Sequence, residues 1–222
     1  MTACAVIPAF QAGQTLGAVA NAVRTAVPSI RVVVVDDGST DGTRALARAV
    51  ADRVVAFDRN RGKGAALRAG FEAALTDGAT TVLTLDADGQ HDAGRASSLL
   101  DALADADIAV GVRRRLGTAM PWPRRMTNTL SSLAVGVCAG RPMADVQSGY
   151  RAVRARVLRA IAPAGDRYEY ETDFLIQAAR AGFTIAWVPV PTVYGGASHF
   201  RGVRDTARVV GTICRRLPLA FR

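Results

Sequence analysis

Several residue types are scarce in this sequence of 222 residues. It contains a single lysine, two histidines and three cysteines, and aromatic residues make up 6% of it. The cysteines, Cys4, Cys138 and Cys214, are odd in number and far apart, so we expect neither a disulfide framework nor a cysteine-rich metal site. Unpaired thiols suit a reducing compartment, and we expect a cytoplasmic protein.

Long apolar segments are also lacking. No run approaches the ~20 residues that cross a bilayer, and the longest mildly apolar stretch, residues 130–140, is interrupted by serine and glycine. The first residues lead directly into an apolar segment, and no signal peptide is visible. We therefore expect no transmembrane anchor, and any membrane contact would be peripheral, on the cytoplasmic face.

Three familiar binding motifs are missing. No Gly-x-Gly-x-x-Gly follows the first apolar segment, which disfavours a dinucleotide-binding fold, and residues 62–64 lack the spacing of a P-loop. The loop that begins at Asp86 is not an EF-hand, because His91 occupies position 6 and Ser97 occupies position 12.

The charge is strongly positive and concentrated. Twenty-eight Lys and Arg residues against 19 Asp and Glu residues give a net charge of +9. Residues 113–125 hold five arginines and no acid, and residues 201–222 hold six arginines and one acid. Such surfaces attract phosphates, acidic lipid headgroups or nucleic acid. No nucleic-acid-binding motif is present, so we expect no nucleic-acid partner.

The hydrophobic pattern alternates between short apolar runs and amphipathic segments as far as residue 112. It predicts strands over 3–7, 31–35, 53–57, 81–85 and 107–112, and helices over 14–25, 42–50, 63–75 and 93–104. Such alternation favours right-handed βαβ units, and therefore an α/β fold with a mainly parallel sheet and helices on both faces. A loop over 113–123 and an amphipathic helix over 124–137 follow.

Two pairs of carboxylates stand at the ends of predicted strands. Asp86 and Asp88 follow the fourth strand; since residues i and i+2 of an extended segment point the same way, they can converge with Gln90 on one hard cation. Asp36 and Asp37 follow the second strand and can accept hydrogen bonds from a ribose or a base. Open α/β sheets bind ligands at these strand ends, although solvated turns and helix caps contain similar acids.

A third segment, residues 60–70, opens a predicted helix with Gly62 and Gly64 on either side of Lys63. Backbone amides at a helix N-terminus favour anions, and glycine lets a ligand approach the backbone closely. The segment is therefore a candidate for binding an anionic ligand.

Together, Val35–Thr43, Asn60–Leu67 and Leu85–His91 resemble motifs of family 2 glycosyltransferases, and most closely those of the dolichol-phosphate mannose synthase branch, the polyprenyl-phosphate glycosyltransferases. The similarity continues in residues 145–152, 168–175, 188–194 and 198–200. It implies a GT-A fold in one domain over residues 1–222. Residues 1–112 would bind a nucleotide sugar, and residues 113–222, which end in a basic helix, would bind the acceptor.

The resemblance also implies roles for residues on the donor side. Contacts to the nucleotide sugar, GDP-mannose or a UDP-sugar, would come from Pro8, Phe10, Asp36, Asp37, Gly62, Lys63, Asp86 and Ala87. Asp86, Asp88 and Gln90 would bind Mn²⁺ or Mg²⁺, which neutralises the leaving diphosphate.

A polyprenyl phosphate acceptor is already anionic, so it needs cationic side chains to hold it rather than a strong base. The resemblance implies this role for Arg113 and for Arg124, which joins Asp88 as an expected catalytic residue. Further acceptor candidates are Asn128, Ser148, Arg151 and His199. For each lone arginine, a solvated face or an ion pair is an equally good explanation.

A soluble hydroxyl acceptor would instead need a carboxylate base, and Glu171 is the candidate. On a helix, Glu169 and Asp173 share a face and Glu171 points elsewhere, so an ordinary amphipathic helix also accounts for these acids.

One departure from the family pattern lies after the first strand, where Gln11 replaces the usual Asn and the following Glu is absent. We predict an inverting, metal-dependent transferase that acts on a polyprenyl phosphate and contacts the membrane through arginines and through Met120, Pro121 and Trp122. The alternatives are a transferase for a hydroxyl acceptor and a catalytically silent nucleotide-sugar-binding protein.

Overall fold

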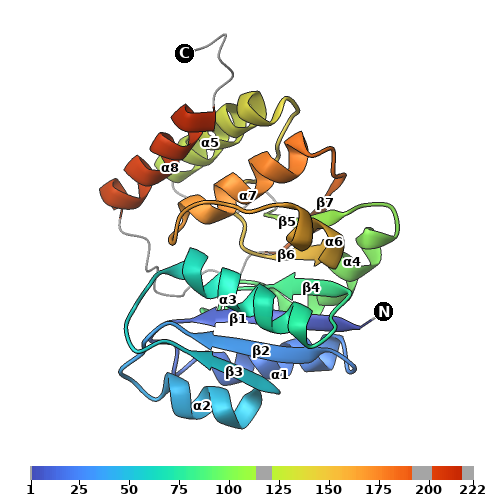
Figure 1. Cartoon of the computed structure of the whole chain (residues 1–222), viewed down its shortest axis with the longest axis vertical. Helices are drawn as coiled ribbons and strands as arrows, with labels where there is room; N and C mark the ends of the chain where they lie inside the picture. The colour runs from blue at the N-terminus through green and yellow to red at the C-terminus, as the bar shows by residue number, and fades with distance from the viewer. Residues whose placement is uncertain (1, 114–121, 192–201, 217–222) are drawn as a thin grey trace.

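The computed structural model describes the backbone of residues 2–113, 122–191 and 202–216 and, within these ranges, the side chains of residues 2–112, 131–191 and 208–216. A sheet of seven strands lies at the centre, in the order β3-β2-β1-β4-β6-β5-β7 (Figure 1). Its strands are β1 Ala3–Ala9, β2 Arg31–Asp36, β3 Arg53–Ala56, β4 Thr81–Thr84, β5 Ile108–Arg113, β6 Arg151–Arg154 and β7 Ile185–Val190.

Strand direction confirms the prediction of a mainly parallel sheet. Only β6 runs antiparallel to its neighbours, β4 and β5, whereas the other pairs are parallel. In β2 the residues from Val32 to Val35 are all buried. Such a continuous apolar run is typical of a central parallel strand that is covered on both faces.

The helices agree with the prediction up to residue 76 and differ in detail after it. They are α1 Leu16–Ala26, α2 Thr43–Val50, α3 Lys63–Thr76, α4 Ala96–Asp101, α5 Trp122–Ala139, α6 Ala155–Ala160, α7 Glu169–Arg180 and α8 Gly202–Arg216. The helix predicted over 93–104 is a short α4 between two 3₁₀ turns, Ala93–Arg95 and Ala102–Ala104.

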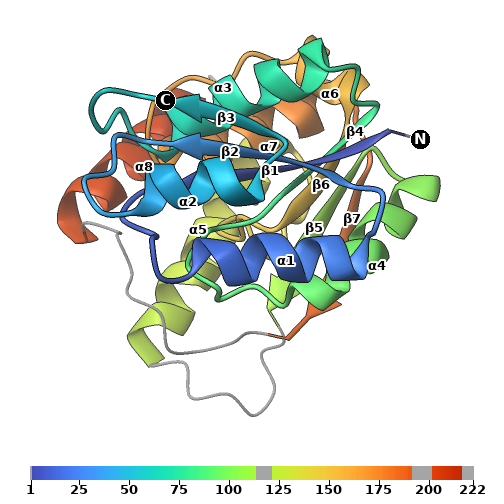
Figure 2. The ribbon, with the colours of Figure 1, turned by 90° about the horizontal axis from the view of Figure 1, so that it is seen from below.

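Two hydrophobic cores lie on opposite faces of the sheet, because alternate side chains of each strand point to opposite sides. Val33 and Val35 join the core that contains residues of α3, α5 and α7. Val32 and Val34 join the core that contains residues of α1, α2 and α4. Figure 2 shows α1 and α3 on opposite sides of the sheet, which confirms the predicted covering of both faces.

The loops that carry the predicted site meet at one edge of the sheet. Because β1, β2 and β4 are parallel, their carboxyl ends at Ala9, Asp36 and Thr84 lie at the same edge. The antiparallel β6 begins there, since Arg151 lies opposite Thr84. The fold therefore brings segments from both halves of the chain to this edge.

Helices α5, α7 and α8 pack against one another at one end of the molecule (Figure 1). The Nε and a terminal nitrogen of Arg216 donate hydrogen bonds of 2.7 and 3.0 Å to the Asp173 carboxylate, which is fully buried. This ion pair fastens the end of α8 to α7. Within the described ranges, none of the helices combines the length and apolarity needed to cross a bilayer.

Candidate functional site

Asp86 lies just beyond β4 and is held by two side chains. The Lys63 ammonium is 2.6 Å from its Oδ1, and the His91 ring nitrogen Nε2 is 3.4 Å from its Oδ2. Burial acts to raise the pKa of Asp86, but the charges of Lys63 and His91 and their hydrogen bonds outweigh burial and lower that pKa well below its usual range. Asp86 is therefore ionised across the physiological pH range.

Asp88 lies in a different environment. Its Oδ1 accepts a 2.9 Å hydrogen bond from the backbone amide of Gln90. Gly89, with a φ of +73°, forms the turn between the two residues. Burial and the nearby charge of Asp86 raise the pKa of Asp88. The two carboxylates are thus close enough to repel each other. Among the described residues, no group of three or more His, Cys, Asp or Glu side chains is arranged to hold a metal ion.

Lys63 links this loop to α7. Its ammonium is 3.1 Å from Oε2 of Glu171 in addition to its contact with Asp86, and its side chain is 16% exposed. Burial acts to lower the pKa of Lys63, but the two carboxylates outweigh it and raise that pKa. A cation from the first half of the chain and an acid from the second half are therefore paired at the sheet edge.

Gly149 makes room for the pair formed by Lys63 and Asp86. A Cβ on this glycine would lie 2.8 Å from the Lys63 ammonium and 2.9 Å from Oδ2 of Asp86. The preceding Ser148 is buried, and its hydroxyl is a buried polar atom without a hydrogen-bond partner. The segment before β6 thus presents bare backbone to the charged pair.

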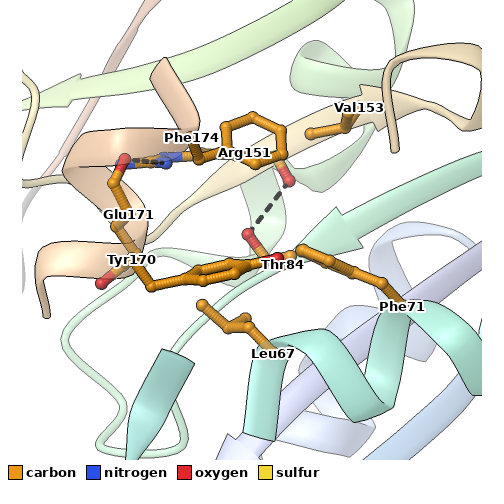
Figure 3. A pocket seen from close by; sticks show the side chains of 8 residues that line it. All are labelled: Leu67, Phe71, Thr84, Arg151, Val153, Tyr170, Glu171 and Phe174. Carbon is orange, nitrogen blue, oxygen red and sulfur yellow. Dashed lines mark hydrogen bonds between the residues drawn. The ribbon is translucent and has the colours of Figure 1, made fainter. Parts of the chain in front are cut away.

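Arg151 is buried and donates to backbone carbonyls. Its guanidinium donates hydrogen bonds of 2.8 Å to the carbonyl of Ser148, 3.1 Å to that of Glu171 and 3.1 Å to that of Val146. Figure 3 shows it beside Glu171. Both residues line a cavity whose volume is about 10 Å³. This volume is roughly that of one water molecule, so the cavity belongs to the interior packing and is too small for a nucleotide sugar.

The acids that follow β2 organise the neighbouring loops. Asp36 is fully buried and pairs with Nε of Arg44 at 2.7 Å. The Asp37 carboxylate accepts hydrogen bonds of 2.6 and 2.9 Å from the amides of Arg61 and Gly62. Burial raises the pKa of Asp37 although these amides oppose the shift. The predicted contacts of both acids to a nucleotide stay a prediction.

The start of α3 is covered by the loop that precedes α7. A Cβ on Gly62 would lie 2.4 Å from the Asp166 carbonyl oxygen, and one on Gly64 would lie 2.6 Å from Cβ of Tyr170. The amide of Ala65 donates to the same Asp166 carbonyl at 3.1 Å. In this structure, therefore, the two glycines allow close packing against this loop, and the Ala65 amide is not free for an anion.

The loop after β1 is fastened by Gln11, the residue that departs from the family pattern. Its Oε1 accepts hydrogen bonds of 2.9 and 3.3 Å from the amides of Thr40 and Asp41. Its backbone has a φ of +52°, a conformation that residues other than glycine rarely adopt. Gln11 therefore supports the loop that contains the half-buried Phe10 and follows Pro8 of β1, two residues that are expected to contact a nucleotide.

Glu169 and Asp173 of α7 both accept hydrogen bonds from backbone amides of residues 164–167, which agrees with the shared face that the helical spacing predicts for this pair. Oε1 of Glu169 accepts hydrogen bonds from the amides of Asp166 and Arg167, and Asp173 pairs with Arg216. Glu171 alone of the three contacts Lys63.

The remaining predicted residues are less completely described. The buried Ala87 accepts a 2.6 Å hydrogen bond at its carbonyl from the Thr15 hydroxyl. Arg113 ends β5, and Arg124 and Asn128 belong to α5, but their side chains lie outside the described part of the chain; His199 lies outside it altogether.

Comparison with known proteins identifies the family. The family model described as Glycosyl transferase family 2 matches residues 4–162. The chain is 38% identical over 202 residues to polyprenol monophosphomannose synthase of Mycolicibacterium smegmatis, covering 83% of this chain and 75% of the relative. It is 36% identical over 204 residues to undecaprenyl-phosphate mannosyltransferase of Micrococcus luteus, covering 87% and 84%.

Among solved structures, glucosyl-3-phosphoglycerate synthase from Mycobacterium tuberculosis, in complex with Mn²⁺, uridine diphosphate and phosphoglyceric acid, is similar in fold. It matches with a TM-score of 0.76 at 22% identity, covering 98% of this chain and 79% of that one. The predicted GT-A type of fold is thereby confirmed. The chain belongs to glycosyl transferase family 2, as its motifs predicted, and is a glycosyltransferase.

Proposed function

We propose that this glycosyltransferase moves a hexose from a nucleotide sugar to a polyprenyl phosphate, with inversion at the anomeric carbon and with the help of a divalent cation. The names of the two relatives that are 36% and 38% identical support a mannosyl donor and a polyprenyl phosphate acceptor. GDP-mannose is therefore the first donor to test, and UDP-sugars are the second.

The observation that carries the proposal is the ion pair between Glu171 and Lys63. The Glu171 carboxylate is paired with the Lys63 ammonium at 3.1 Å, and the Glu171 side chain is 9% exposed. A carboxylate that is occupied by a cation and almost fully shielded from solvent is poorly placed to act as a base, because a general base must lie within hydrogen-bond reach of the hydroxyl proton that it removes. A phosphate acceptor needs no base, since its attacking oxygen is already anionic. The pairing therefore supports a phosphate acceptor over a hydroxyl acceptor.

We propose that the residues after β4 hold a hard divalent cation. Asp86, Asp88 and Gln90 offer oxygen ligands, which Mg²⁺ and Mn²⁺ both accept. The charge of Asp86 raises the pKa of Asp88, so a positive ion here would stabilise both carboxylates in their ionised forms. When bound, the cation would neutralise the negative charge that grows on the leaving diphosphate.

The other expected contacts divide between the two substrates. Pro8, Phe10, Asp36, Asp37 and the backbone of Gly62 and Ala87 are our candidates for the nucleotide. Arg113, Arg124 and Asn128 are our candidates for the acceptor phosphate, through charge-assisted hydrogen bonds, and His199 is a further one. Ser148 also remains a candidate, because its hydroxyl lacks a partner. Arg151 is a weaker candidate, because its guanidinium donates to three carbonyls.

Peripheral contact with a membrane is part of the proposal. Leu133 and Val137 lie one turn apart on α5, and they are 66% and 44% exposed. We propose that these apolar side chains act together with the positive charge of the arginine clusters at 113–125 and 201–222, a combination that suits an anionic lipid surface.

A transfer assay tests the proposal. The protein would be given Mn²⁺ and GDP-mannose or a panel of UDP-sugars, with and without a polyprenyl phosphate, and the products would be identified by mass spectrometry. We expect a lipid-linked sugar phosphate with one donor. Hydrolysis of a donor without a lipid product would contradict the proposed acceptor and favour a hydroxyl acceptor.

A further inference from the structure

The ion pairs around Lys63 place one cation between two acids from different halves of the chain. Lys63 is the first residue of α3, Asp86 follows β4, and Glu171 lies in the first turn of α7. The ammonium is 2.6 Å from Asp86 and 3.1 Å from Glu171, and the side chains of Lys63 and Glu171 are 16% and 9% exposed. Removal of the cation would leave two carboxylates in a partly buried position without their shared counter-charge.

The surroundings fix the ammonium in this place. Gly149 supplies bare backbone on one side, because any Cβ there would lie 2.8 Å from the ammonium. The ring of Tyr168 lies on another side, with its centroid 5.8 Å from the ammonium. The bridging position is therefore built by three segments that are distant in the sequence.

Asp86 is also one of the residues that we propose as a ligand of the divalent cation. A second cation that approaches its carboxylate is repelled by the ammonium, and this repulsion is strong where water is partly excluded. Glu171 offers the ammonium a second carboxylate, with which it remains paired when its hold on Asp86 weakens.

We propose that Lys63 is an internal cation that competes with the divalent ion for Asp86, and that Glu171 is a positioning residue that sets this competition by holding Lys63. This inference rests on the proposed metal-dependent function. It assigns Glu171 a role on the donor side, through Lys63, in place of a role as a base on the acceptor.

The inference predicts opposite changes in metal affinity. Lys63→Met removes the competitor and should lower the Mn²⁺ concentration at half-saturation by about three- to tenfold, the size expected for one partly buried ion pair. Glu171→Gln keeps the shape of the side chain but lets Lys63 bind Asp86 more tightly, so it should raise that concentration by a similar factor. In the double variant, Glu171→Gln should have little further effect, because it acts through Lys63.

The experiment measures Mn²⁺ binding by the electron paramagnetic resonance signal of the free ion, with GDP and, in parallel, UDP present. Arg48→Met is the matched control, because Arg48 is an exposed cation on α2. The melting temperature without metal serves as a second readout: Lys63→Met should lower it, and the added Glu171→Gln should restore part of the loss.

Each other result has a defined meaning. Suppose that the wild-type protein binds Mn²⁺ and transfers sugar, and that Lys63→Met has the same Mn²⁺ midpoint as the wild type. This result overturns the present inference and leaves the proposed function standing. An equal effect of Glu171→Gln with and without Lys63 overturns the positioning role. A wild-type protein that neither binds Mn²⁺ nor turns over any donor overturns the proposed function and this inference together.

Discussion

Replacement of Asp88 by Asn should raise the stability of the fold and lower the transfer activity. The pKa of Asp88 is raised by burial and by the charge of Asp86, so at neutral pH the ionised side chain destabilises the folded state. Asp88→Asn removes this repulsion. Because the side chain is only partly buried, we expect a gain of at most about 1 kcal/mol, which raises the melting temperature of a domain of this size by about 2–4 °C.

The same substitution should abolish most of the transfer. It removes a carboxylate that we propose as a metal ligand, and a loss of several kcal/mol of transition-state stabilisation corresponds to a rate about 10²–10³-fold lower. Calorimetry without metal and a transfer assay with Mn²⁺ measure the two effects, with Asp101→Asn, at an exposed position of α4, as the control.

The pH dependence of the stability gain gives a further check. The folded-state pKa of Asp88 lies above the unfolded value, so the destabilisation is absent while both states are protonated and develops as the pH rises through the folded pKa. The difference between the wild type and Asp88→Asn should therefore vanish below a pH of about 3.9. A variant that melts lower than the wild type at neutral pH, or that transfers sugar at a near-normal rate, would refute the reasoning.

Three other predictions concern the surroundings of the site. Gly149→Ala should push Lys63 and Asp86 apart and lower kcat for transfer by about tenfold or more, since small misplacements are costly. The control is Gly17→Ala on α1, whose added Cβ makes only ordinary contacts and which should leave kcat unchanged. If Gly149→Ala had the same kcat as the wild type, the geometry argued for this site would be contradicted. Arg124→Ala should raise KM for the polyprenyl phosphate and leave donor hydrolysis unaltered, and unchanged acceptor kinetics would rule out its phosphate contact. Arg216→Ala should lower the free energy of unfolding, measured in urea, by about 1–3 kcal/mol. Because pairing lowers the pKa of Asp173, this loss of stability should shrink as the pH falls below about 3.9. A loss of the same size at every pH would contradict the role of the ion pair.

The first half of the fold could be predicted because its hydrophobic pattern is regular. Residues 31–35 are a continuous apolar run, and such runs alternate with amphipathic segments, so the strands, the helices and the parallel arrangement follow from the sequence. Strand β6 was not predicted. It has only four residues with an arginine at each end, and its place between β4 and β5 depends on pairing across the sheet.

The contacts among the candidate site residues could be predicted only in part from the sequence. The acids at the ends of β2 and β4 stand out in the sequence. The partners of these acids do not, because Arg44, Lys63 and Glu171 reach them only after the chain has folded. The sequence offers one signal for the bridge, namely that Lys63 is the single lysine in a chain rich in arginine. Its pairing with Glu171 depends on the packing of α7 against α3.

A comparison of two lipid acceptors tests the central claim most directly. The wild-type protein would receive the preferred donor and Mn²⁺ with either a polyprenyl phosphate or the corresponding polyprenol, at equal concentration in the same detergent, and the lipid product would be measured. We predict transfer to the phosphate and none to the alcohol, because Glu171 is paired with Lys63 and an anionic acceptor needs no base. Comparable transfer to the alcohol would contradict the account.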